Sequence, residues 1–102
     1  MQVKAIIRRQ FKQEHTEEVL ALFYDFRAHA MKQPGYISAE ILIAHEDPKQ
    51  VLVIATWQSI SDWHKWKESK IRKEFEAMLE VYQAGPAQYE EFVVAEYPLN
   101  LK

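Results

Sequence analysis

The order in which two hydrophobic periodicities follow one another restricts the fold of this chain more than any other feature of its sequence. Residues 2–11 (QVKAIIRRQF) alternate as in a β-strand. One face of that strand would carry Val3, Ala5, Ile7, Arg9 and Phe11. Thr16 then precedes a segment whose apolar residues recur every three or four positions, which predicts an amphipathic helix. Its stripe consists of Val19, Leu20, Phe23, Phe26 and Ala30, and Gln33-Pro34-Gly35 ends it.

Two further strands are predicted next, at residues 36–45 (YISAEILIAH) and 50–57 (QVLVIATW). Both are rich in β-branched residues, and the polar turn 46–49 between them favours a hairpin. Ser59, with Asp62 three residues later, predicts the start of another helix.

That second helical stretch is expected from residue 61 to residue 83, with a bend near Ser69. Its predicted inward stripe is Ile71, Phe75, Met78 and Tyr82. Glu68 and Arg72, four residues apart, are expected to form a surface pair. Gly85-Pro86 ends the stretch, and residues 88–97 (QYEEFVVAEY) predict the last strand.

The resulting order, β-α-β-β-α-β, predicts one α+β domain over residues 1–102 with a ferredoxin-like fold. Such a fold has a four-stranded antiparallel sheet with its helices on one face. The other face would carry Ile6, Leu52 and Ile54, and an exposed apolar sheet face usually marks an association surface. We therefore expect a homodimer formed sheet to sheet.

Composition excludes several classes of function. Thirteen basic and fifteen acidic residues give a net charge of −2, which provides no basic field for nucleic acid. The chain has no cysteine, so neither a disulfide nor a thiolate nucleophile is expected. No apolar run has the length of a signal peptide or a membrane span, which favours a cytoplasmic protein without membrane contact.

A cluster of motifs carries a resemblance to a known family. Trp57-Gln58-Ser59, then Trp66 and Ser69, together with the upstream Gln33-Pro34-Gly35-Tyr36, resemble the antibiotic biosynthesis monooxygenase family. The resemblance implies a dimeric α+β barrel of ferredoxin-like subunits. It also implies one of two activities. One branch of the family oxygenates polyphenolic rings with dioxygen alone, and another binds haem and degrades it.

The haem-degrading branch can be compared position by position. Trp66 matches the tryptophan that lines the haem pocket there. The asparagine of the first strand is replaced by Ile7, and the histidine that ligates iron is replaced by Glu76. Isoleucine donates no hydrogen bond, and a carboxylate is a rare axial ligand of haem. The haem-degrading mechanism is therefore not expected, and no cofactor is predicted.

Candidate site residues follow from the resemblance and from the predicted faces. We expect Trp66 and Arg9 to be catalytic, Trp66 as a flat aromatic wall and Arg9 as a charge that stabilises an anion. The residues expected to bind substrate are Ile7, Phe23, Tyr24, Trp57 and Phe75. In the alternative interpretation the two indoles only fill the core and Arg9 is paired with a glutamate. Trp63 is expected in surface or interface packing, and His64 in solvent.

No metal site is predicted, because His15, His29 and His45 are too scattered for a ligand spacing. The favoured function is a cofactor-independent monooxygenase that acts on a small aromatic, polyphenolic or quinone-type molecule. The alternatives are a non-catalytic module that binds a hydrophobic ligand such as haem, and a dimeric interaction domain. The substrate itself is not predicted.

Overall fold

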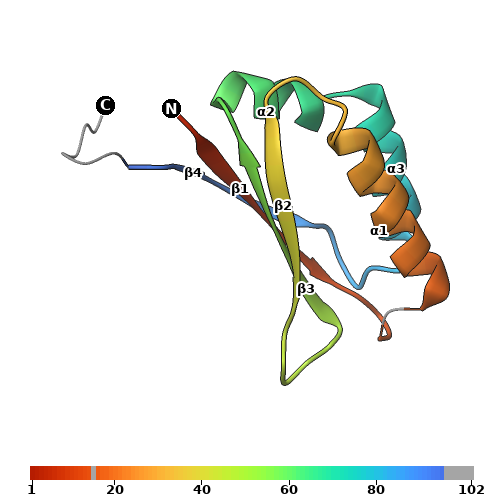
Figure 1. Ribbon diagram of the computed structural model, residues 1–102. Helices are drawn as coiled ribbons and strands as arrows, with labels where there is room; N and C mark the ends of the chain where they lie inside the picture. The colour runs from red at the N-terminus through yellow and green to blue at the C-terminus, as the bar shows by residue number, and fades with distance from the viewer. Residues whose placement is uncertain (15, 96–102) are drawn as a thin grey trace.

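Three helices cover one face of a four-stranded antiparallel sheet and leave the other face bare (Figure 1). The computed structural model describes residues 1–14 and 16–95. The elements are β1 (Val3–Gln10), α1 (Glu17–Ala30), β2 (Tyr36–Ile43), β3 (Gln50–Trp57), α2 (Ile60–Lys67), α3 (Lys70–Glu80) and β4 (Gln88–Val93). The strand order is β2-β3-β1-β4, so β2 and β4 are the edge strands. The predicted α+β, ferredoxin-like class is confirmed.

The expected second helix is divided in two. Residues 68 and 69 separate α2 from α3, and the hydroxyl of Ser69 accepts a hydrogen bond from the backbone N–H of Arg72 at 3.2 Å. A side chain that caps a new helix satisfies a donor that the helix itself leaves unpaired. The bend expected near Ser69 is therefore a new helix start. The last strand ends at Val93, four residues before its predicted end, and residues 96 and 97 of that prediction lie outside the described residues.

The register of the central strands determines which side chains face the helices. Ile7 of β1 lies opposite Val53 of β3, and Arg8 lies opposite Leu52. Alternation along β1 buries Val3, Ala5, Ile7 and Arg9 beneath the helices, as predicted. The bare face carries Ile6 opposite Ile54, together with charged side chains.

Charged residues on the bare face are paired along the sheet. Arg8 forms a salt bridge of 2.8 Å with Glu90 of the neighbouring strand. The Lys4 ammonium donates to the Thr56 hydroxyl at 2.8 Å. No helix of the described residues is long and apolar enough to cross a membrane.

The inward stripe of α3 differs from the predicted one. Ile71 and Met78 are 41% and 43% exposed, whereas Arg72, Phe75 and Leu79 are buried. The predicted and the observed stripe both recur at helical spacing. Because the observed stripe contains Arg72, its sequence resembles that of a solvent-exposed helix face. Glu68 does not pair with Arg72; its carboxylate lies 3.2 Å from the Lys73 ammonium.

Trp63 is part of the core, so its expected surface position is wrong. Its side chain is 1% exposed, and its ring centroid lies 6.0 Å from that of Trp57. Trp63 and Trp66 are three residues apart on α2, and such residues share one side of a helix. Both indoles therefore point toward the sheet.

Candidate functional site

A cavity of about 60 Å³ lies between the helices and the sheet. Its aromatic walls are Phe23, Phe26, Tyr36, Trp57, Trp63 and Trp66, which include all three tryptophans of the chain. Its aliphatic walls are Ile7, Ala30, Ala39, Ile41, Val53 and Ala55. Arg27 and Ile41 are exposed, whereas the tryptophans are buried. The mouth of the cavity therefore lies between the end of α1 and the edge strand β2.

Three arginines complete the lining: Arg9, Arg27 and Arg72. Among the described residues that line the cavity there is no aspartate, glutamate, histidine or lysine. Arg9 and Arg72 are both 3% exposed, and Arg27 lies at the mouth. The walls thus combine apolar aromatic surface with positive charge alone.

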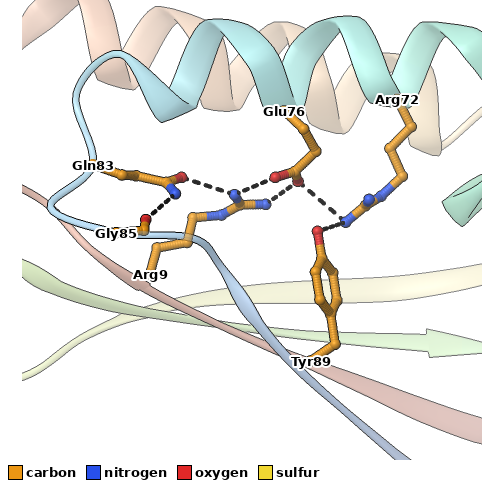
Figure 2. A network of polar contacts seen from close by, with 6 residues as sticks. All are labelled: Arg9, Arg72, Glu76, Gln83, Gly85 and Tyr89. Atoms are coloured by element: carbon orange, nitrogen blue, oxygen red, sulfur yellow. Dashed lines mark hydrogen bonds and ion pairs between the residues drawn. The ribbon is translucent and has the colours of Figure 1, made fainter.

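The two buried arginines share one carboxylate. Figure 2 shows Glu76 and Arg72 pointing from α3 toward Arg9 of β1 and Tyr89 of β4. The Arg9 guanidinium donates to both carboxylate oxygens of Glu76, from Nη1 at 2.8 Å and from Nη2. The Arg72 Nη2 lies 3.2 Å from Oε1 of Glu76. We call Arg9, Arg72 and Glu76 the buried arginine cluster.

Two neutral side chains extend this cluster. The Gln83 side-chain oxygen accepts from Arg9 Nη1 at 3.0 Å, and the Tyr89 hydroxyl lies 3.1 Å from Arg72 Nη2 as its acceptor. Gln83 in turn donates to the backbone carbonyl of Gly85 at 3.0 Å (Figure 2). The terminal nitrogens of Arg9 are therefore held by partners from two separate segments.

Burial and charge act in opposite directions on Glu76. Burial raises the pKa of its carboxyl group, but the hydrogen bonds and charge of Arg9, followed by the charge of Arg72, outweigh that effect. The pKa of Glu76 consequently lies below its ordinary value of 4.5. At neutral pH Glu76 is an ionised carboxylate and a poor proton acceptor.

Arg72 lies among aromatic rings as well as beside Glu76. Its guanidinium carbon is 5.3 Å from the Trp63 ring centroid, 5.1 Å from that of Tyr89 and 5.7 Å from that of Phe26. Guanidinium groups at such distances are attracted by the negative faces of the rings. This aromatic surrounding explains how α3 can bury an arginine in its inward stripe.

A second cluster of polar side chains lies beside α2. The Glu91 carboxylate of β4 accepts from the Trp63 indole N–H and lies 3.0 Å from Nε2 of His64. Partial burial raises the pKa of Glu91, but these hydrogen bonds and the charges of His64 and Lys67 bring it below the ordinary value. His64 is half exposed, as expected, and Glu91 is the partner that the sequence did not reveal.

The cavity brings together five of the seven predicted site residues: Ile7, Arg9, Phe23, Trp57 and Trp66. Tyr24 lies on the outer side of α1 and is 73% exposed. Phe75 is buried but does not line the cavity; its ring stacks on Phe26 with centroids 5.0 Å apart.

Sequence reasoning did not find Phe26, Trp63, Arg27 or Arg72 as wall residues. The sequence contained a signal for two of these wall residues, namely the three-residue spacing of aromatic side chains along each helix. Phe26 follows Phe23 by three positions, and Trp66 follows Trp63 by three, so each pair shares one side of its helix.

No group of three or more histidine, aspartate and glutamate side chains is placed to hold a metal ion within residues 1–14 and 16–95. The cavity is also small. A cavity of about 150 Å³ is known to admit one benzene molecule, and this one has about 60 Å³. Its enclosed part therefore has room only for a group smaller than benzene.

Solved structures share this fold at low sequence identity. SnoaB from Streptomyces nogalater, a cofactor-independent oxygenase, superposes with a TM-score of 0.81 and 15% identity over 93% of this chain and 94% of SnoaB. A conserved protein from Methanosarcina mazei Go1 gives 0.82 and 16%, over 90% of this chain and 91% of its own. Rv0793 from Mycobacterium tuberculosis gives 0.80 and 11%, over 94% and 97%.

Among curated protein sequences none matches this chain. The family described as antibiotic biosynthesis monooxygenase, in contrast, has a sequence model that matches residues 2–81. That range includes every described strand and helix except β4. It contains all three residues of the buried arginine cluster, whereas Gln83 and Tyr89 lie beyond it. The chain belongs to the antibiotic biosynthesis monooxygenase family.

Proposed function

We propose that this chain is a monooxygenase that needs no cofactor and oxidises a small aromatic, polyphenolic or quinone-type molecule in the cavity. The observation that carries the proposal is the lining: six aromatic side chains and three arginines, with no carboxylate among the described residues that line the cavity. Family membership and the description of SnoaB as a cofactor-independent oxygenase support it.

The proposed reaction converts an activated CH₂ group to a carbonyl with one dioxygen molecule and releases one water. The substrate loses a proton to water at the mouth of the cavity, which gives an electron-rich anion, and this anion passes one electron to dioxygen. The two radicals combine at the substrate carbon, and the resulting peroxide takes up a proton and loses water. All the electrons come from the substrate, so no external reductant is required.

The residues of the cavity would serve this reaction in three ways. The indole of Trp66 provides a flat wall, and the aromatic enclosure excludes water from the radicals. Arg9 and Arg72 place positive charge where the anion forms, and preorganised charge in a dry site stabilises such an anion. Because no carboxylate or histidine is found among the described residues of the lining, we assign to the arginines the role of lowering the pKa of the substrate.

The test is oxygen consumption by the purified protein with an anthrone or a quinol. Ala30→Leu narrows the cavity from the end of α1, and Ala28→Leu makes the same change on the exposed side of that helix. We expect Ala30→Leu to lose most of the activity and Ala28→Leu to keep it. Trp66→Phe should reduce turnover. No oxygen-dependent product from the wild-type protein, or equal activity of both leucine variants, would remove the proposal.

A non-catalytic binding module is the second candidate, and the absence of a base from the lining favours it. Haem is a poor occupant, because Glu76 at the ligand position is held by two arginines. A haemin titration that gives no sharp change in the Soret band excludes haem. Binding of an aromatic ligand without oxygen-dependent turnover would favour the module.

We also propose that the bare face of the sheet forms a homodimer. It exposes Phe92 and places Ile6, Ile54 and Leu52 on the central strands. Sedimentation equilibrium should give a dimer at micromolar concentration. Ile54→Lys should dissociate it, whereas Ile71→Lys, on the exposed side of α3, should not. A monomeric wild-type protein would contradict this.

A further inference from the structure

The buried arginine cluster carries an excess of positive charge. The side chains of Arg9 and Arg72 are 1% and 3% exposed, and they share Glu76 as the carboxylate with which both form ion pairs. Two positive charges and one negative charge leave one positive charge without a counter-ion in the described part of the chain. A buried charge is strongly unfavourable unless it is paired.

Three buried hydrogen-bond donors also have no acceptor in the described part of the chain. They are Nε of Arg9, Nε of Arg72 and Nε1 of Trp57, and each is buried. All three belong to residues that line the cavity. Most buried N–H groups are hydrogen-bonded, so three orphans around one cavity require an explanation.

We infer that the cavity recognises an oxyanion carried by a planar ring, either the carboxylate of an aromatic acid or the oxygen of an ionised phenol. This inference rests on the proposed function in taking the cavity as the substrate site, and it adds the charge of the substrate. An anionic oxygen would neutralise the excess charge and offer an acceptor toward which the orphan donors can turn. Hydrogen bonds to charged groups are the stronger kind.

The size of the cavity fits this assignment. About 60 Å³ accommodates an oxyanion group but not a whole ring. The ring then occupies the mouth, bordered by Arg27, Ala30 and Ile41, where its face meets apolar surface. Arg27 adds a third positive charge on the path of entry, which attracts an anion from solution.

The inference is tested by isothermal titration calorimetry with two pairs of probes at slightly alkaline pH. Benzoate is compared with benzamide, and para-nitrophenolate with para-nitroanisole. At least one anion should bind about tenfold more tightly than its neutral counterpart, or better, as expected for hydrogen bonds to a charged group. The pair that shows the difference tells whether a carboxylate or a phenolate is preferred.

Substitutions of arginines test whether the anion binds in the cavity. Arg72→Gln should weaken binding of the preferred anion about tenfold or more, and Arg27→Gln, at the exposed mouth, a few-fold. Arg8→Gln, on the bare face of the sheet, is the matched control and should leave it unchanged. Circular dichroism checks that each variant is folded. If Arg72→Gln is unfolded, Arg27→Gln still tests the inference, because the Arg27 side chain is exposed and its replacement should not affect folding.

Equal affinity for the anion and its neutral counterpart in both pairs, or no binding of either anion, would overturn the inference. So would an Arg8→Gln variant that weakens binding as much as Arg27→Gln does. The measurement involves no turnover. A protein that binds anions without consuming oxygen refutes only the proposed function, and one that oxidises a neutral quinol while ignoring both anions refutes only this inference.

Discussion

Replacing Glu76 by glutamine tests the energetic role of the buried arginine cluster. The carboxylate accepts two hydrogen bonds from Arg9 and lies 3.2 Å from Arg72. Its side chain is 12% exposed, and both arginine side chains are almost fully buried. Removal of one partner from a buried ion pair typically costs about 3–5 kcal/mol. Because glutamine keeps one acceptor oxygen, we expect a loss near the lower limit, about 3 kcal/mol.

The assay is urea unfolding at neutral pH and fixed protein concentration. In a domain of this size a loss of about 3 kcal/mol should also lower the melting temperature by at least about 12 °C. Glu74→Gln, two residues earlier on the exposed side of α3, is the matched control and should change the free energy of unfolding by less than about 0.5 kcal/mol. A Glu76→Gln protein within about 1 kcal/mol of that control would refute the reasoning.

The same pair of proteins predicts a pH dependence. The pKa of Glu76 in the folded protein is lowered from 4.5, so its stabilising contribution is present above that value and is lost as the pH falls through the folded pKa. The difference in stability between wild type and Glu76→Gln should therefore shrink as the solution is acidified from neutral pH. A difference that stays constant through the acid range would show that the carboxylate charge is not its source.

Three further substitutions test local features by thermal or urea unfolding. Gly35 has φ of 84°, and a Cβ there would lie 2.3 Å from an Asp62 oxygen, so Gly35→Ala should cost about 2 kcal/mol; Gly85→Ala meets no atom within 4 Å and should be nearly neutral. Ser69→Ala removes the cap of α3 and should cost about 1 kcal/mol, more than Ser61→Ala inside α2, and equal losses would contradict the separate helix start. Trp63→Phe should cost about 1–2 kcal/mol and raise the pKa of Glu91, which loses its indole donor; an unchanged Glu91 titration by NMR would contradict that bond.

Local patterns were enough to predict the fold. Alternation along β1 assigned Ile7 and Arg9 to the helix side, and the turn at 46–49 joined the two strands of the hairpin as expected. These features depend on neighbours in sequence, which periodicity reports directly. The order of elements and their short connections then left few possible topologies.

The partners of the charged residues could not be predicted in the same way. Arg9 and Glu76 are 67 positions apart, and their contact depends on how α3 is rotated on the sheet. That rotation was misjudged, because a stripe with Arg72 and Glu76 reads as a solvated surface when each charge is considered alone. Only the cluster as a whole accounts for the buried orientation, since Glu76 forms ion pairs with both Arg9 and Arg72.

The cavity volume and its unpaired donors depend on packing, which a residue pattern does not determine. Tyr24 shows that a residue pattern can misplace even the direct neighbour of a cavity residue. It follows Phe23 directly, yet Phe23 lines the cavity and Tyr24 lies outside, because consecutive residues point about 100° apart around a helix.

The turn at Gly35, before β2, determines which wall of the cavity can move. The Gly35 carbonyl accepts from the backbone N–H of Gln58 at 2.8 Å, and its Cα lies against Asp62 at the start of α2. The turn is thus hydrogen-bonded to the segment that leads into α2 and lies close to the first turn of that helix, which carries Trp63 and Trp66. Among the described strands, β2 has a hydrogen-bonded neighbour on one side only. We therefore expect a wider ring to displace the part of this edge strand around Ile41 while the indole wall stays in place.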